Sequence, residues 1–380
     1  MKQNPNYILR KIADVPYLLP FGQMVADQKR GLRINETGEY LWNLLAQEQG
    51  QEELLATAAA YYQILPRDRD TFDEDIIAFL QQLMDYGLLI DDSPWHQSQG
   101  PRHYMQIGGL SLCFHGNKEA FPEEFQPFCT SFREEIHQSI FLHPFPPRVR
   151  QNGTLLLRNR ELAVIRQEDF YILLFPQFTR LHEIHISQDG SRVICYHIPD
   201  YCPDFRTDLF HALRFCYLYL ALQKGRVALH SASLLYNKKL WLFTGSSGTG
   251  KSTHTNLWKE LYDITLINGD LNLIDTSGPE ILVPGIPWCG TSGICHTSCH
   301  PLGGIILLKQ ASADLIEELP TDRKELLVSQ RFISPSWTNQ QFDLHLIAAQ
   351  KIAQQIPICM LHCTPRTSAV HCMKEWIDSL

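Results

Sequence analysis

The chain has 380 residues, of which 44% are hydrophobic and 19% charged, and its formal net charge is −8. This composition is typical of a globular protein, and the length is enough for two or three domains with sizeable cores. The longest strongly apolar stretch, Phe215–Leu222, is too short to cross a bilayer, and the N-terminal residues lack a secretory signal, so we expect no membrane association and no export.

Residues 1–92 are predicted to form a small acidic domain, with eight Lys and Arg against fifteen Asp and Glu. Short strands are expected at Tyr17–Pro20, Gln23–Ala26 and Gly31–Ile34. Three helices should follow, the first capped by Asn35, the second at Glu52–Gln63 and the third at Thr71–Tyr86, ending at Gly87. Residues 93–102 are polar, contain proline and glycine, and are predicted to be a linker.

Residues 103–226 are predicted to be rich in antiparallel sheet and to end in a helix. Strands are expected at Leu110–Phe114, Thr154–Arg158, Leu162–Arg166, Tyr171–Phe175, Glu183–Ser187 and Arg192–Ile198. The last two flank Gln188-Asp189-Gly190-Ser191, a good hairpin signal. A helix should run over Arg206–Gln223, and its aromatic residues are most simply core packing.

Residues 227–380 are predicted to form an α/β domain, with a mixed sheet flanked by helices. Strands are expected at Ala228–Leu235, Leu240–Thr244, Ile264–Ile267, Leu271–Ile274, Gly304–Leu308 and Ile358–His362. Helices are expected at Lys251–Leu261, Asp322–Phe332, Gln341–Gln355 and Ser368–Ser379. The fold class is therefore a multidomain α+β and α/β protein.

One motif carries chemistry: Gly245-Ser246-Ser247-Gly248-Thr249-Gly250-Lys251-Ser252 fits the P-loop pattern G-x-x-x-x-G-K-[ST] without deviation. Glycines let backbone N–H groups surround phosphates, and the following helix directs its positive end at the same anion. Lys251 would neutralise β- and γ-oxygens, and the hydroxyl of Ser252 can bind Mg²⁺. We assign these residues and Thr253 to a nucleotide site, with ATP or another nucleoside triphosphate and Mg²⁺ as the expected cofactors.

Two residues outside the motif are candidates for the same site. His230 lies on the strand before the P-loop, and a hairpin could bring it to the phosphates, although a histidine on a strand is more often a core residue. Asp270 follows an apolar strand. A carboxylate at a strand end beside a P-loop is well placed to bind Mg²⁺ or to accept a hydroxyl proton.

Leu229-His230-Ser231-Ala232, the P-loop and Gly269-Asp270 together resemble the HPr kinase/phosphorylase family, which is related in fold to ATP-dependent phosphoenolpyruvate carboxykinase. The resemblance implies phosphoryl transfer to a serine hydroxyl, with His230, Lys251 and Asp270 as catalytic residues, and implies oligomerisation. One departure is that the family usually has two adjacent acids where this chain has Gly269-Asp270. The loop Pro287-Trp288-Cys289-Gly290 is similar to HPr kinase-like proteins of peptide-modifying gene clusters, and Trp288, Cys289 and Gly290 are expected to face substrate.

The N-terminal domain resembles the PqqD-like family, a winged-helix-like peptide recognition element, through Gly31–Trp42 and the helix that closes on Tyr86-Gly87-Leu88-Leu89. In that family a leader peptide adds as an extra strand to the third strand and packs on the third helix. The resemblance implies a precursor peptide as partner. The groove residues are expected to be Arg30, Leu32, Arg33, Ile34, Ile76, Phe79, Leu80 and Leu83. A small helical domain with no peptide role is the alternative.

Other signals are less specific. Cys289, Cys295, His296, Cys299 and His300 fall within twelve residues, but they contain no C-x-x-C pair, so a loop is favoured over a metal site. Eleven cysteines without an export signal indicate reduced thiols in the cytoplasm. Clustered basic residues are lacking, and we expect no nucleic-acid partner. Arg323, Arg331 and Arg366 are candidates to contact the transferred phosphate, and the sequence does not choose among them.

The sequence thus predicts a cytoplasmic ATP-dependent kinase that grips a leader segment and phosphorylates a hydroxyl, most simply serine, of a ribosomally made peptide. Three alternatives stay open. A kinase for a small hydroxylated molecule such as serine would not need residues 1–92. A nucleotide-dependent peptide chaperone would transfer nothing, and a nucleotidyl transferase would give a product of different mass.

Overall fold

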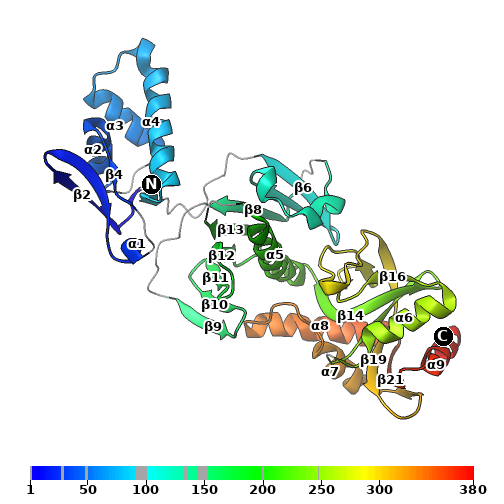
Figure 1. Cartoon of the computed structure of the whole chain (residues 1–380). Coiled ribbons are helices and arrows are strands. Elements are labelled where there is room, and N and C mark those ends of the chain that lie inside the picture. The colour runs from blue at the N-terminus through cyan, green and yellow to red at the C-terminus, as the bar shows by residue number, and fades with distance from the viewer. Residues whose placement is uncertain are drawn as a thin grey trace. The chain divides into compact units, whose positions relative to one another are not determined.

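A computed structural model of the chain describes residues 2–26, 30–47, 50–90, 101–131, 135–143, 153–198, 201–246 and 248–380. The chain forms two compact units, shown in Figure 1. One comprises Met1–Ser98 with the short segments Leu142–Asn152 and Tyr196–Asp200, and the other comprises the remainder. Of the predicted linker, only Pro101 and Arg102 are described.

The N-terminal unit consists of two small sheets and three longer helices. The strand order is β2-β3-β4 in one sheet, and β1 pairs with β5 in the other. The elements are β1 (Lys2–Gln3), β2 (Tyr7–Ile12), β3 (Val15–Pro20), α1 (Gln23–Ala26), β4 (Leu32–Arg33), α2 (Glu36–Leu44), α3 (Gln51–Tyr61), α4 (Arg69–Asp85) and β5 (Leu89–Ile90). Asn35 caps α2 as predicted, because its Oδ1 accepts the N–H of Gly38 at 2.8 Å.

The strand expected at Gln23–Ala26 was wrong, because this segment is the short helix α1. The strand that pairs with β3 lies earlier in the chain than expected. It is β2, which pairs with β3 along its full length. Ala13 and Asp14 make the tight turn between them with φ of 47° and 62°. Since β4 takes the other edge of β3, no edge of that strand is left for residues 23–26.

After residue 101, eight strands form a mixed sheet in the order β6-β7-β8-β13-β12-β11-β10-β9. They are β6 (Arg102–Ile107), β7 (Leu110–His115), β8 (Gln138–His143), β9 (Thr154–Arg158), β10 (Ala163–Arg166), β11 (Phe170–Leu174), β12 (Leu181–Ser187) and β13 (Arg192–His197). Two of them, β6 and β8, were not predicted. Helix α5 (Pro203–Gln223) is largely buried and bonds to this sheet, since the Tyr217 hydroxyl donates to the carbonyl of Ile107 at 3.0 Å.

A second sheet carries the P-loop. Its strands are β14 (Arg226–Tyr236), β15 (Lys239–Thr244), β16 (Thr265–Asn268), β17 (Leu271–Asp275), β18 (Leu282–Pro284), β19 (Cys299–Gln310), β20 (Leu315–Glu318) and β21 (Ile358–Cys363). Its helices are α6 (Lys251–Tyr262), α7 (Thr321–Ser329), α8 (Asn339–Gln355) and α9 (Thr367–Asp378). Strands β15, β19 and β21 are parallel neighbours, whereas β14 is antiparallel to β15 and β17.

Alternating side chains of the second sheet fill two cores. Leu240 and Leu242 of β15 pack in a core shared with α7 and α8, and the intervening Trp241 and Phe243 pack in a core shared with α6 and α9. In Figure 1 the pair α7 and α8 lies to one side of these strands and the pair α6 and α9 to the other. A mixed sheet flanked by helices, preceded by a small sheet with helices, confirms the predicted fold class. Among the described residues, no helix is both apolar enough and long enough to cross a membrane.

Candidate nucleotide and catalytic site

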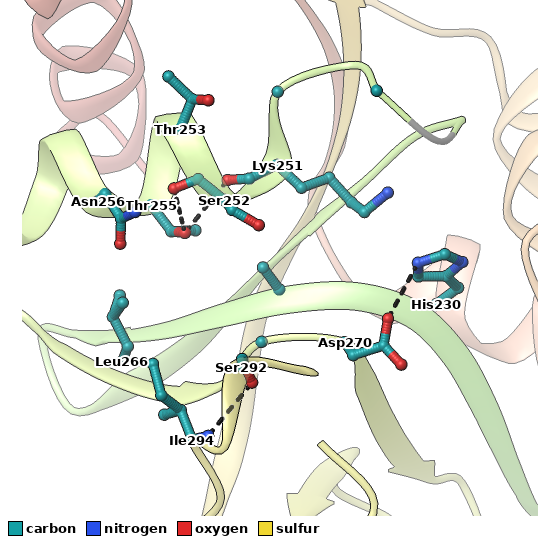
Figure 2. Close-up of a pocket in the computed structure, with 14 residues that line it drawn as sticks. His230, Lys251, Ser252, Thr253, Thr255, Asn256, Leu266, Asp270, Ser292 and Ile294 are labelled. Carbon is teal, nitrogen blue, oxygen red and sulfur yellow. Dashed lines mark hydrogen bonds and ion pairs between the residues drawn. The ribbon is translucent and has the colours of Figure 1, made fainter. Parts of the chain in front are cut away.

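A cavity of about 610 Å³ opens where β15 leads into α6, and Figure 2 shows the residues around it. Four segments form its wall: the middle of β14, the P-loop with α6, the turn after β16 and the loop after β18. The lining residues are His230, Ala232, Gly248, Gly250, Lys251, Ser252, Thr253, Thr255, Asn256, Leu266, Gly269, Asp270, Ser292 and Ile294. The predicted site residues on this wall are His230, Gly248, Gly250, Lys251, Ser252, Thr253 and Asp270, whereas Gly245, Ser246 and Thr249 are not among its lining residues.

The P-loop has the backbone that a phosphate needs. Gly248 and Gly250 have φ of +79° and +96°, and a Cβ on either would meet open space. Glycine is therefore required there by the backbone conformation rather than by crowding. Helix α6 begins at Lys251, and no described side chain caps its first amides. Those N–H groups and the helix dipole suit the phosphates of a nucleotide. Ser247 lies outside the described residues.

Positive charge lies beside these amides. Lys251 Nζ donates to the carbonyl of Gly245 at 3.0 Å and to that of Ser246 at 3.4 Å. Burial lowers the pKa of Lys251, and Arg331 acts in the same direction, whereas Asp270 opposes both. The lysine is thus held on the phosphate-binding loop within the electrostatic reach of an acid and of a second cation.

His230 and Asp270 meet across two neighbouring strands. His230 pairs with Leu271 in the ladder of β14 and β17, which sets the carboxylate beside the imidazole. His230 Nε2 lies 3.3 Å from Asp270 Oδ1, and both side chains are 41% exposed. The hydrogen bond from His230 and the charges of His230, Arg214 and Lys251 lower the pKa of Asp270. Asp270 is therefore an ionised carboxylate that faces the P-loop.

Asn268 holds the turn that presents Asp270. Its Oδ1 accepts the N–H groups of Asp270 at 3.0 Å and Leu271 at 3.1 Å. Its Nδ2 donates to the carbonyl of Trp288 at 3.2 Å, which ties the turn to the loop after β18. Ser252 and Asp270 offer two oxygen ligands on one cavity, and oxygen is what Mg²⁺ prefers. These two residues would hold a magnesium ion, which would supply positive charge beside the phosphates of a nucleotide.

The expectation that Trp288 faces substrate needs correction. Its side chain is 3% exposed and packs on Phe210 and Phe125, and its Nε1 donates to the carbonyl of Phe210 at 3.0 Å. Trp288 therefore anchors the loop in the core. The part of the loop that reaches the cavity is Ser292 and Ile294.

Cys289 is half-buried on this loop and is not an activated thiol. Burial and the neighbouring Cys295 raise the pKa of Cys289 to about 11, so the thiol is protonated at neutral pH. Cys299 and His300 belong to β19. Within the described part of the chain, no three Cys, His, Asp or Glu side chains are grouped to hold a metal ion.

The three candidate arginines have different surroundings. Arg323 donates a hydrogen bond to Glu317 at 3.0 Å. Arg366 directly precedes α9, and its charge helps to lower the pKa of Asp314. The charge of Arg331 lowers the pKa of Lys251, and the backbone carbonyl of Arg331 accepts the N–H of His230 at 3.3 Å. The Nε of Arg331 is buried and has no hydrogen-bond partner among the residues that the structure describes. Arg331 is thus the one of the three beside the P-loop.

Sequence reasoning missed Arg214 on α5. Its charge lowers the pKa of Asp270, and burial lowers its own pKa. A signal was present in the sequence, because Arg214 is the one Lys, Arg, Asp or Glu in the apolar stretch from Leu209 to Leu222. Burial of a charged side chain is costly unless the charge is paired, so a single arginine in such a stretch indicates a nearby acidic partner.

The predicted leader groove is divided between core and surface. Ile34, Ile76, Leu80 and Leu83 are at most 5% exposed and belong to the core of the N-terminal unit, so they cannot contact a peptide directly in this arrangement. Arg30 and Arg33 are exposed, whereas Leu32 and Phe79 are half-buried. Ile77 of α4, which was not predicted, is 40% exposed. Strand β4 pairs with β3 and with no other described strand, and therefore offers an edge.

Helix α6 contains a titratable group that should make stability depend on pH. His254 is 3% exposed, accepts a hydrogen bond from Trp258 Nε1 at 3.1 Å, and burial lowers its pKa to about 4. The neutral form is favoured in the folded state, so its contribution is complete above pH 6.5 and is lost as the pH falls towards 4. We expect this single group to lower the free energy of unfolding by up to about 3 kcal/mol over that range. Denaturant unfolding of His254→Gln should show a shallower pH dependence than the unaltered chain, and an equal slope would contradict the assignment.

Comparisons with known proteins agree with the N-terminal resemblance. Residues 23–89 match the family described as coenzyme PQQ synthesis protein D (PqqD). Among solved structures, the chain is similar to the Hpr(Ser) kinase/phosphatase from Coxiella burnetii, with 15% identity and a TM-score of 0.17, over 24% of this chain and 62% of that chain. No curated protein matches the chain. Given that score, the assignment of the C-terminal region depends on the site residues themselves.

Proposed function

We propose that the protein is an ATP-dependent kinase that phosphorylates a hydroxyl, most simply serine, of a ribosomally made precursor peptide. One observation carries the proposal: a P-loop with an uncapped helix end shares a cavity with the contact between His230 and Asp270. Binding of a nucleotide phosphate would need only the P-loop and the helix end. The carboxylate opposite the cradle supports transfer to an acceptor, because it can receive the proton that the acceptor hydroxyl loses.

The chain's own residues divide the work of transfer. The P-loop amides and Lys251 bind the β- and γ-phosphates of ATP, and Ser252 with Asp270 would hold Mg²⁺, which neutralises charge on the phosphates. Asp270 orients the acceptor hydroxyl and takes its proton, with His230 sharing that proton across their 3.3 Å contact. The acceptor oxygen bonds to the γ-phosphorus as the bond to the β,γ-bridging oxygen breaks, and ADP leaves.

Two arginines are assigned supporting roles. The charge of Arg331 is felt by Lys251, and its Nε has no hydrogen-bond partner among the described residues, so Arg331 would contact the transferred phosphoryl group, where charge increases during transfer. Arg214, on α5, lowers the pKa of Asp270 through its charge and so helps to keep that carboxylate ionised. We also place the reaction in the cytoplasm, where ATP is available and where the eleven free thiols would stay reduced.

The N-terminal unit would supply the substrate. The match to PqqD and the edge of β4 support binding of a leader segment as an added strand, with Arg33 and Phe79 beside it. A leader bound to one part of the chain raises the local concentration of the attached acceptor into the millimolar range. Weak contacts between the catalytic cavity and the acceptor are then sufficient.

The test compares a precursor peptide encoded by a neighbouring gene with its leaderless form. With γ-labelled ATP and either peptide at roughly 0.1 mM, we expect the initial rate for the full peptide to be about tenfold or more higher, because the tethered acceptor is in the millimolar range. Free leader added in trans should inhibit the full peptide and should not activate the leaderless one. Equal rates for the two peptides would refute tethering while leaving the kinase intact.

The same assay separates the remaining alternatives. Label on the peptide would reject a chaperone that binds ATP without transfer, and an added phosphate rather than a nucleotide in the product mass would reject nucleotidyl transfer. Rapid phosphorylation of free serine, unaffected by precursor peptide, would favour a small-molecule kinase. Elution volume in the presence and absence of nucleotide would test the expected homo-oligomer.

A further inference from the structure

The loop after β18 presses its backbone against the catalytic carboxylate. Residues Gly290–Ser292 form a short 3₁₀ turn, here called the carboxylate turn. A Cβ added to Gly290 would lie 2.7 Å from Cβ, Cγ and Oδ2 of Asp270. Such a distance is well inside van der Waals contact, so a side chain at position 290 would clash with Asp270. Only glycine lets the backbone of the turn lie this close to the carboxylate. One side of Asp270 faces His230, and the opposite oxygen faces this turn.

The contact is reciprocal, because the residue before Asp270 is also a glycine against the same turn. A Cβ on Gly269 would lie 2.4 Å from Cβ and Oγ of Ser292. Ser292 is itself held in place, since its hydroxyl donates to the carbonyl of Cys289 at 2.6 Å and accepts the N–H of Ile294 at 3.2 Å. Figure 2 shows Ser292 beside the chain segment that carries Asp270. Any side chain at position 269 would therefore collide with the turn.

Both ends of the loop are fixed, which makes the turn a firm support. Trp288 is buried and its carbonyl accepts the Asn268 side chain. At the base of the loop, Gly285 lies so close to His296 that a Cβ would overlap its carbonyl oxygen, and the Gly285 N–H donates to Ser298 at 2.9 Å. A turn held in this way can restrict the Asp270 side chain to the orientation that meets His230.

We propose that the carboxylate turn is a positioning element of the catalytic centre, which holds Asp270 against His230. This inference rests on the proposed kinase function for its kinetic consequences. Its structural part, the orientation of Asp270 by Gly290, can be measured without turnover.

Two glycines of the same loop provide a matched pair of variants. Gly290 and Gly293 have φ of +58° and +63°, so alanine strains the backbone equally at both, but a Cβ at Gly293 meets nothing within 4 Å. We expect Gly290→Ala to lower kcat for peptide phosphorylation at least about tenfold at saturating ATP and Mg²⁺, because displacement of a catalytic group acts on the reaction step. Gly293→Ala carries the same backbone strain without the contact to Asp270, so it should keep kcat close to that of the unaltered chain. Equal kcat in the two variants would overturn the proposal.

A second pair tests the reciprocal contact by rescue. Gly269→Ala should lower kcat, and adding Ser292→Gly should restore part of the loss because it removes the atoms that the new Cβ meets. Absence of any rescue would count against the contact between these two residues.

A readout without turnover separates this inference from the proposed function. Electron paramagnetic resonance of Mn²⁺ with ADP should show weaker metal binding in Gly290→Ala than in Gly293→Ala, since Asp270 is an expected metal ligand. If the unaltered chain phosphorylates no peptide, the kinase proposal fails, and the Mn²⁺ comparison still decides whether Gly290 positions Asp270. Identical Mn²⁺ affinities would refute the positioning role.

Discussion

Asp270→Asn should reduce kcat for phosphoryl transfer by about a thousandfold, within the range that general base catalysis supplies. The substitution keeps the shape of the side chain and removes the charge that His230, Arg214 and Lys251 surround. An amide cannot take the proton of an acceptor hydroxyl. Because the P-loop is untouched, the Kd for ADP without metal should change little, so the loss should appear in kcat rather than in ground-state binding.

A matched control for this variant is available on the helix that follows the P-loop. Asp263 ends α6 in a left-handed conformation with φ of 51°, which asparagine tolerates, and it is exposed. Asp263→Asn removes the same charge and should leave kcat unchanged. Near-normal turnover of Asp270→Asn in single-turnover experiments would show that another group performs the reaction.

Lys251→Ala should weaken ATP binding by about a hundredfold, because a hydrogen bond to a charged group contributes roughly 1.5–3 kcal/mol. In the structure its ammonium group lies on the carbonyls of the P-loop, where the β- and γ-phosphates would be placed. Isothermal titration with ATP and with AMP should distinguish the two groups of contacts. The loss should be large for ATP and small for AMP, which has no β- or γ-phosphate.

Lys259 provides the control for charge alone. It lies on the same helix, is exposed, and is not among the residues that line the cavity. Lys259→Ala should bind ATP as the unaltered chain does. If both variants lose affinity equally, the effect comes from the overall charge and the P-loop assignment is wrong.

Local patterns predicted the elements that depend on neighbours in the chain. The cap at Asn35, the helix opening at Lys251 and the strand over Leu240–Thr244 are all encoded within a few residues, and the structure confirms each. The segment Gln23–Ala26 was misjudged because its conformation depends on which strands already occupy the edges of β3. Strand β8 pairs in parallel with β7, from which it is separated by more than twenty residues, and its short apolar run gives little sign of that.

The same distinction applies to the site. The P-loop was readable because one continuous motif supplies the whole phosphate cradle. Asp270 was recognised as a carboxylate that follows an apolar strand after the P-loop, and the strand register accounts for its contact with His230. Trp288 and Arg214 could not be placed from local pattern, because burial of an indole and the approach of a distant helix to a carboxylate are tertiary facts. The fit of Gly269 against Ser292 joins residues 23 positions apart and has no local sign.

Strand β14 has a consequence for how the enzyme would move. Its first half pairs with β17, which leads from Asp270, and its second half pairs with β15, which leads into the P-loop. Asp270, His230 and the P-loop are therefore attached to neighbouring strands of one hydrogen-bonded sheet. No hinge separates them within that sheet, so we expect their spacing to stay fixed. If the chain is the peptide kinase proposed above, acceptor recognition should come from binding of the leader by the N-terminal unit, and peptide binding or product release should limit the rate.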